Sequence, residues 1–349
     1  MKILSQCRFI LLALSLFFYS FVGPEDDLEE VFKQDIVIET KRIVLPEYPL
    51  AFNPGIIRWN GGILMSFRII PDPKSTFTSL IGLVQLDNEF NVIGKPQLLK
   101  TREEKDISPS RAEDARLFTV KDRLYVTYDD CYPLKINKAG FRVYIAEIVF
   151  NNNQFELKDA ECLNDFEGQS PDIREKNWVP FEFGNQMYLA YSLKPHTIFR
   201  PLLGSGSCET VERTNNSIKW PWGILRGSTS AMLDNGQYLA FFHSSTELVS
   251  AHSKGRKSLH YFMGAYTFSA SPPFFITSIS KDPIVGPGFY NGEEYKHYWK
   301  PVHVVFPCGY IFDHEFIWLA YGRQDHEMWV AKINKTKLYE SLDPVYLTK

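Results

Sequence analysis

The sequence predicts an all-β protein, and three features support this fold class. Aromatic residues make up 15% of the 349 residues, and aromatic side chains favour strands. Beyond the N-terminal segment, no long stretch shows the period of an amphipathic helix. Short apolar runs alternate instead with turns that contain Gly, Asn or Asp, which is typical of strands joined by hairpins.

A strand–turn–strand pattern occurs five times along the chain. The copies cover residues 56–67, 115–128, 178–191, 229–243 and 304–321. They begin about 50 to 75 residues apart, which suits a four-stranded propeller blade with its loops. Residues 141–150 and 261–268 are expected to form outer strands. The pattern therefore predicts a single five-bladed β-propeller over residues 24–349. Two β-sandwiches are the alternative, and the even repetition argues against them.

The N-terminal segment is typical of a targeting sequence. An apolar run over residues 9–22 follows Lys2 and Arg8, and it is short for a membrane span. We therefore expect residues 1–23 to be a signal peptide or an N-terminal anchor, because no pronounced cleavage site decides between them. The protein is expected to be secreted, or membrane-anchored and facing away from the cytosol.

Composition and cysteine content limit the other classes of function. The net charge is −3, so nothing favours a nucleic-acid partner. The sequence shows no spacing typical of a metal site, and we expect none. Four cysteines follow the targeting segment, namely Cys131, Cys162, Cys208 and Cys308. This even number is compatible with one or two disulfides in an oxidising compartment.

A charged cluster lies at the start of the second repeat. Glu113 and Asp114 stand between Arg111 and Arg116. Neighbouring residues of a strand point to opposite faces, so we expect the two carboxylates to have different environments. Burial raises the pKa of a carboxyl group and a nearby arginine lowers it. The cluster therefore suits one acid and one fixed anion. For four charged residues taken alone, the alternative is an exposed strand edge with salt bridges.

Polar residues recur at equivalent positions of the other repeats. A propeller would bring these positions together at one end of its central channel. Outside the charged cluster they are Asn53, Arg68, Glu175, Lys176, Asn177, Trp178, Lys194, Arg226, His243 and Asp325.

This set of residues resembles glycoside hydrolase family 130, whose members are five-bladed propellers that act on β-mannosides. The family's Glu-Asp-Pro-Arg block is matched by Glu113–Arg116, with Ala115 in place of proline. Further blocks are matched by Lys176–Trp178, by Arg226–Thr229 followed by His243, by Phe306–Gly309 and by Tyr321–Asp325. Most members are inverting phosphorylases, and fewer are hydrolases.

The resemblance implies a role for each residue. Asp114 would be the general acid, acting through a sugar hydroxyl, and its pKa should be raised by burial. Phosphate would be bound by Lys176, Asn177, Lys194, Arg226 and His243. The mannoside would be bound by Asn53, Arg68, Glu113, Arg116, Trp178 and Asp325. A structural salt bridge remains open for Glu113, and a role in the core for His243.

The expected activity is phosphorolysis of β-mannosides to mannose 1-phosphate, or mannosyl transfer in the reverse direction. The expected substrates are a mannose-containing oligosaccharide and inorganic phosphate, with no other cofactor. An exported β-mannosidase is an alternative, with Asp172, Glu175 or Asp325 as its base. A non-catalytic glycan-binding propeller is a second alternative.

Overall fold

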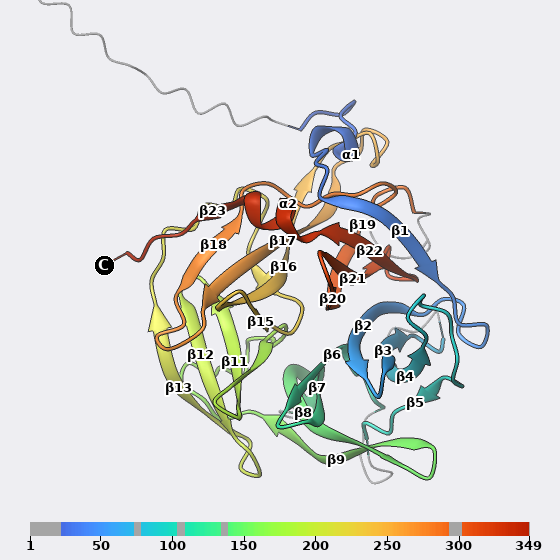
Figure 1. The fold of residues 1–349 in the computed structure, drawn as a ribbon, viewed down its shortest axis with the longest axis vertical. Coiled ribbons are helices and arrows are strands. Elements are labelled where there is room, and N and C mark those ends of the chain that lie inside the picture. Colours follow the sequence, from blue (N-terminus) through green and yellow to red (C-terminus); the bar gives the residue numbers. More distant parts are fainter. Residues whose placement is uncertain (1–21, 73–77, 103–108, 134–138, 293–301, 349) are drawn as a thin grey trace, which may run out of the picture.

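The computed structural model describes residues 22–72, 78–102, 109–133, 139–292 and 302–348. Five sheets stand around a common centre (Figure 1), and they are antiparallel apart from one parallel pair of strands in the fourth sheet. The predicted all-β propeller is therefore confirmed. Each of the five sequence repeats falls on the strands closest to the channel, and the two predicted outer strands are present.

The sheets follow one another along the chain as blades. Blade one contains β2 (Phe52–Trp59), β3 (Gly62–Ile69), β4 (Leu80–Leu86) and β5 (Gln97–Leu98). Blade two contains β6 (Glu113–Val120), β7 (Arg123–Pro133), β8 (Ala139–Asn151) and β9 (Gln154–Leu163). Blade three contains β10 (Val179–Phe183), β11 (Gln186–Leu193), β12 (His196–Leu202) and β13 (Ser207–Thr214).

The fourth sheet is larger than its neighbours. It contains β14 (Arg226–Gly227), β15 (Met232–Asp234), β16 (Gln237–Leu248), β17 (Ser258–Ser269) and β18 (Ile276–Ser280), and also β19 (Val302–His303) and β23 (Leu342–Pro344). The last strand follows the helix α2 (Lys335–Glu340). Two segments that are distant in sequence therefore complete blade four.

Blade five joins the two ends of the chain. Its strands are β20 (Val305–Asp313), β21 (Phe316–Arg323), β22 (Glu327–Asn334) and β1 (Val37–Ile43). Strand β1 pairs antiparallel with β22, and Figure 1 shows the blue N-terminal strand beside the red C-terminal ones. Because β1 comes from the other end of the chain, this pairing closes the ring. The short helix α1 (Leu28–Val31) precedes it.

Tight turns join the two inner strands of the blades. Asn60 and Gly61 connect β2 to β3 with φ values of 47° and 78°, and Asn235 and Gly236 connect β15 to β16 with 48° and 77°. Two successive residues with positive φ suit the twist of a hairpin, and Asn and Gly adopt this conformation readily. These turns explain why the repeats can be recognised in the sequence.

The blades pack through apolar and aromatic side chains. Between blades two and three, Trp178 is 1% exposed and contacts the rings of Phe166 and Phe199. Between blades four and five, Phe241 packs edge-on against Tyr310. The high aromatic content is therefore largely used in the interfaces between blades.

Two expectations outside the fold class have different outcomes. Cys131, Cys162, Cys208 and Cys308 are all free thiols, so the disulfides with which their even number is compatible are absent from the part of the chain described. Each of the four lies on a different strand, namely β7, β9, β13 and β20. The predicted targeting segment falls almost wholly on residues 1–21, outside the described residues. No helix among the described residues is long and apolar enough to cross a membrane.

Candidate functional site

A cavity of about 690 Å³ lies at one end of the central channel and receives residues from all five blades. Its lining includes carboxylates, basic groups and aromatic rings. The lining residues include Asn53, Arg68, Glu113, Asp114, Glu175, Lys176, Asn177, Arg226, His243, Tyr261, Phe306 and Asp325. A second cavity of about 480 Å³ is lined mainly by apolar residues such as Phe118 and Phe181, so it does not suit acid–base chemistry.

Glu113 and Asp114 both face the larger cavity, contrary to the expected alternation of a strand. The β6–β7 register shifts between Glu113 and Arg116, and Asp114 has a φ of 54°. A bulge of this kind turns a side chain out of the regular alternation. The expectation that the two carboxylates lie in different environments is therefore wrong, because it assumed a regular strand.

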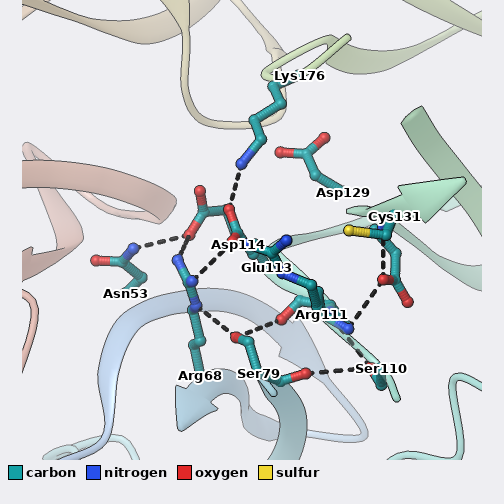
Figure 2. Close-up of polar contacts among 12 residues, drawn as sticks. Asn53, Arg68, Ser79, Ser110, Arg111, Glu113, Asp114, Asp129, Cys131 and Lys176 are labelled. Carbon is teal, nitrogen blue, oxygen red and sulfur yellow. Dashed lines mark hydrogen bonds and ion pairs between the residues drawn. The ribbon is translucent and has the colours of Figure 1, made fainter. Parts of the chain in front are cut away.

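Arg68 holds the two carboxylates together (Figure 2). Its guanidinium lies 2.9 Å from Glu113 Oε1 and donates to Asp114 Oδ1 over 3.3 Å. Its Nε donates to Ser79 Oγ over 2.7 Å, which fixes the side chain from below. One arginine from blade one therefore sets the positions of both carboxylates of blade two.

Asn53 binds Asp114 from the same side. Its Nδ2 donates to Asp114 Oδ1 over 2.8 Å, and its φ of 50° belongs to another bulge, between Phe52 and Gly55. A Cβ on Gly322 would lie 2.0 Å from Asn53 Oδ1. Glycine at position 322 is therefore required for Asn53 to reach Asp114.

These contacts reverse the expected pKa shift of Asp114. Burial raises the pKa of this carboxyl group, but Arg68, Lys176, Arg116 and the Asn53 hydrogen bond together lower it below its ordinary value. The expectation of a raised pKa is therefore wrong. Asp114 is a carboxylate at neutral pH.

Lys176 approaches the same carboxylates from blade three. Its amine forms an ion pair with Glu113 Oε2, as Figure 2 shows, and lies 3.6 Å from the centre of the Phe141 ring. Glu113 therefore bridges Arg68 and Lys176, and its salt bridges are part of the cavity wall.

Arg116 lies beneath the cavity and does not line it, so the expected contact with sugar is not available to it. The residue is 1% exposed. It donates to the carbonyl oxygens of Asp114 and Ser228, and over 2.7 Å to Asn177 Oδ1. Because Asn177 Oδ1 accepts this bond, its Nδ2 is the group left to donate to a ligand. Arg116 therefore positions residues of three blades.

The basic residues of blade four form the opposite wall. Arg226 is exposed and pairs in register with His243. His243 Nδ1 lies 2.6 Å from Ser228 Oγ, and its ring packs against Phe306 at 4.5 Å. Burial and the nearby arginines lower the pKa of His243 to about 3. The imidazole is therefore neutral, and it can serve a ligand as a hydrogen-bond donor but not as a cation.

Two other predicted residues lie away from the cavity or within the core. Lys194 is absent from the cavity lining, because its amine donates to the Ile218 carbonyl over 2.6 Å. Trp178 touches the lining but is almost fully buried between aromatic rings, so its faces are occupied. Sequence spacing placed both correctly beside the β10–β11 hairpin but could not give their side-chain directions.

The three candidate bases are placed differently. Glu175 and Asp325 line the cavity, whereas Asp172 is exposed and does not. Burial raises the pKa of Glu175 above its ordinary value. Asp325 has a φ of 54° and lies in the turn between β21 and β22.

Three residues of this region were not among those predicted for the site. Tyr261 and Phe306 line the cavity, and Asp129 lies buried beneath it. The signal for Asp129 was its position directly after the apolar strand 124–128, where a charged residue is unusual. Among the described residues, no cluster of His, Cys, Asp or Glu is arranged to hold a metal ion.

The fold and the cavity define a β-propeller with an axial site for a polar or anionic ligand. Residues 25–343 match the family described as beta-1,4-mannooligosaccharide phosphorylase. The chain therefore belongs to glycoside hydrolase family 130, as the sequence blocks indicated. No curated protein sequence matches the chain.

Solved structures share the fold at low sequence identity. The beta-1,2-mannobiose phosphorylase of Listeria innocua, in complex with beta-1,2-mannobiose, is 17% identical with a TM-score of 0.56 and covers 88% of this chain and 94% of its own. MPT-4, a mannose phosphorylase of Leishmania mexicana in complex with a phosphate ion, is 12% identical with a TM-score of 0.57 and covers 92% and 94%. A third structure, also 12% identical with a TM-score of 0.57 and coverage of 92% and 96%, is described with glycoside hydrolases that target beta-1,2 mannosidic linkages in Candida mannan.

Proposed function

We propose that the protein catalyses the inverting phosphorolysis of β-mannosides to mannose 1-phosphate, and the reverse mannosyl transfer. One observation carries this proposal. The Asp114 carboxylate on blade two and the basic and amide groups on blades three and four line the same cavity. A mannose-containing oligosaccharide and inorganic phosphate are the proposed substrates, without a further cofactor.

The state of Asp114 suits the synthetic direction. When mannose is transferred to an acceptor hydroxyl, that oxygen loses a proton and a carboxylate must receive it. The lowered pKa keeps Asp114 ionised, so it is ready to act as this base. In phosphorolysis the same group must first gain a proton, because the leaving oxygen requires one.

The phosphate subsite would be formed by Lys176, Asn177, Arg226 and His243. Phosphate is already an anionic nucleophile, so the attack on the anomeric carbon requires positioning and charge compensation but no base. Lys176 and Arg226 supply positive charge, whereas Asn177 and the neutral His243 supply N–H groups. Lys194 is left out of this subsite because its amine is bound elsewhere. The phosphate ion in the complex of the Leishmania mexicana phosphorylase supports an anion site in this fold.

The mannoside would lie between this subsite and blade one. Asn53, Arg68 and Glu113 surround Asp114 and offer hydrogen bonds to sugar hydroxyls. Tyr261 and Phe306 supply ring surface, and Asp325 a further carboxylate in the same cavity. The mannobiose in the complex of the Listeria innocua phosphorylase supports a mannosyl substrate.

A hydrolase is the second candidate, and the cavity contains carboxylates that favour it. Glu175 or Asp325 would hold the attacking water, since both line the cavity with Asp114. An inverting hydrolase separates its two carboxyl groups by roughly 6.5–9.5 Å to leave room for that water. The similarity of the fold to a structure described with glycoside hydrolases supports this second candidate.

Incubation with short β-mannosides, with and without inorganic phosphate, tests the proposal. We expect mannose 1-phosphate to form only when phosphate is present. Free mannose at the same rate in both reactions would make the protein a hydrolase. The absence of any product, together with binding of mannosides, would favour a glycan-binding propeller.

Export is proposed separately, on the strength of the apolar segment within residues 1–23. We expect the full chain to leave the cytosol and a chain without residues 2–23 to remain there. Fractionation of cells that express each form, followed by immunoblotting, measures this difference. Retention of both forms in the cytosol would contradict the proposal.

A further inference from the structure

Asp129 is a buried carboxylate next to the site. It lies in β7 directly opposite Glu113 of β6 and is 1% exposed. Figure 2 shows it beside the Lys176 side chain. Substrate cannot touch it, so any effect on binding must pass through its neighbours.

The contacts of Asp129 leave its charge poorly compensated. Its Oδ2 is buried without a hydrogen-bond partner among the described residues. The nearest cationic nitrogen, Arg116 Nη1, lies 3.8 Å away, which is too far for a hydrogen bond. Arg116 donates instead to Asp114, Asn177 and Ser228. A buried carboxylate oxygen without a hydrogen bond makes the ionised form unfavourable, which favours uptake of a proton.

The charges that act on Asp129 come from two elements. Glu113, Asp114 and Arg116 belong to β6, and Lys176 precedes β10. With Arg68, which binds both carboxylates, the cluster holds three cations and two carboxylates besides Asp129. A protonated Asp129 leaves the cluster with a net positive charge, whereas an ionised Asp129 makes it neutral. Burial raises the pKa of Asp129 to about 7, so both forms exist near physiological pH.

We propose that Asp129 is a positioning residue that links proton uptake to anion binding in the phosphate subsite. Phosphate binds more strongly when Asp129 is protonated, because the cluster around Lys176 is then positive. This inference rests on the proposed phosphate subsite and adds to it the residue that sets its charge.

Thermodynamic linkage gives the sign of the effect. A bound dianion near Lys176 adds negative charge, which favours the protonated form of Asp129, and the proton comes from solvent. By reciprocity, protonation of Asp129 favours the anion to the same extent. Anion affinity is therefore highest below the pKa of about 7. Above it, affinity falls by up to about tenfold per pH unit until the pKa of the anion complex is reached.

Sulfate is the probe that separates this effect from the titration of phosphate itself. Sulfate remains a dianion throughout the useful pH range, whereas phosphate changes its own charge near neutrality. We would titrate sulfate into the full chain by calorimetry from pH 6 to 9. For the wild type we expect affinity to fall by about tenfold or more across this range, with net proton uptake measured by using buffers of different ionisation enthalpy.

The Asp129→Asn variant should abolish the linkage. A neutral amide resembles the protonated carboxyl group, so sulfate affinity should be independent of pH. At pH 9 this variant should bind sulfate more tightly than the wild type. It should also be more stable than the wild type at pH 8.5, since an acid with a raised pKa lowers stability as pH rises through that pKa.

Asp130→Asn is the matched control. Asp130 is the next residue of the same strand and is also buried, but it accepts hydrogen bonds from Arg102 and from the Arg111 amide. Its substitution should leave the pH dependence of sulfate affinity as in the wild type. A general effect of removing a buried carboxylate from β7 would change both variants alike.

Each outcome decides the inference. A wild type that binds sulfate without proton uptake would overturn it, as would an Asp129→Asn variant with an unchanged slope. If that variant does not fold, the net proton uptake measured when the wild type binds sulfate still tests the inference. Absence of sulfate and phosphate binding at every pH would overturn the phosphate subsite as well. Phosphate-dependent formation of mannose 1-phosphate without any proton linkage would overturn the role of Asp129 alone.

Discussion

Asn53 and Asp114 meet across the interface between the first two blades, and both have left-handed backbone conformations. The Asn53 amide donates to Asp114 Oδ1 over 2.8 Å, and the two φ values are 50° and 54°. Each residue lies at a bulge in the innermost strand of its blade. The bulges therefore aim both side chains into the channel and help to keep Asp114 ionised.

Asn53→Gly should reduce the fraction of Asp114 that is ionised and able to act as the base. Glycine keeps the positive φ but removes the hydrogen bond, so the pKa of Asp114 should rise. In mannosyl transfer from mannose 1-phosphate, which needs ionised Asp114, the acid limb of kcat/KM should move to higher pH. The loss of a hydrogen bond to a charged group should also lower the rate about tenfold or more.

Asn60→Gly provides the control for this substitution. Asn60 is an exposed turn residue of the same blade and also has a positive φ. Its replacement should leave the pH–rate profile unchanged. An Asn53→Gly profile identical to that of the wild type would refute the role of Asn53.

Lys176 and Lys194 should differ in their effect on phosphate. Lys176→Met removes a cation from the cavity wall, so the KM for phosphate should rise roughly tenfold or more. Lys194→Met removes an amine that binds the Ile218 carbonyl outside the cavity, and the KM for phosphate should not change. Initial rates at varied phosphate concentration measure both. Equal effects of the two substitutions would contradict the proposed subsite.

The difference between these lysines illustrates what the sequence could and could not predict. Alternating apolar residues and Asn-Gly turns were enough for the five blades, because pattern and turn chemistry are local. The direction of a side chain depends on bulges and on neighbours from other blades. Such long-range contacts turn Glu113 and Asp114 toward the same cavity. They also bury Arg116 and hold Lys194 away from the site.

Arg116 should matter for stability as well as for binding. Arg116→Met leaves the carbonyl groups of Asp114 and Ser228 and the Asn177 amide without their donor. Breaking a buried charged network costs about 3–5 kcal/mol, and urea denaturation should show a loss of this size. Arg123→Met is the control, since Arg123 pairs with Glu147 at the surface. There we expect a much smaller loss, because an exposed ion pair contributes little to stability. A loss no greater at Arg116 would contradict its placement.

Stability should fall as the solution becomes acidic. Burial lowers the pKa of His196, His260 and His303 to about 4 and that of His243 to about 3. The unfolded chain takes up protons at these residues from pH 6.5 downward, whereas the folded protein takes them up only near the lowered pKa values. Their stabilising contribution is complete above pH 6.5 and is lost as the pH falls toward 4, by up to about 1.4 kcal/mol per pH unit for each histidine.

Asp129 acts in the opposite direction, because its pKa is raised to about 7. Asp129 increases the free energy of unfolding as the pH falls from 7 to about 4. The opposite effect of the four histidines is larger. Urea denaturation at pH 7, 6 and 5 should therefore show decreasing free energy of unfolding. His196→Gln should give a shallower dependence than the wild type. A free energy of unfolding that does not change with pH would contradict the buried, neutral histidines.

The stereochemistry of the product tests the central claim most directly. A short β-mannoside and inorganic phosphate would be followed by proton and phosphorus NMR with the wild type and with Asp114→Asn. One inverting displacement by phosphate converts a β-mannoside into α-mannose 1-phosphate. We expect this product from the wild type only when phosphate is present, and a loss of rate of roughly 10²–10⁴-fold in Asp114→Asn. Free mannose formed without phosphate, or full activity of Asp114→Asn, would contradict the proposed reaction.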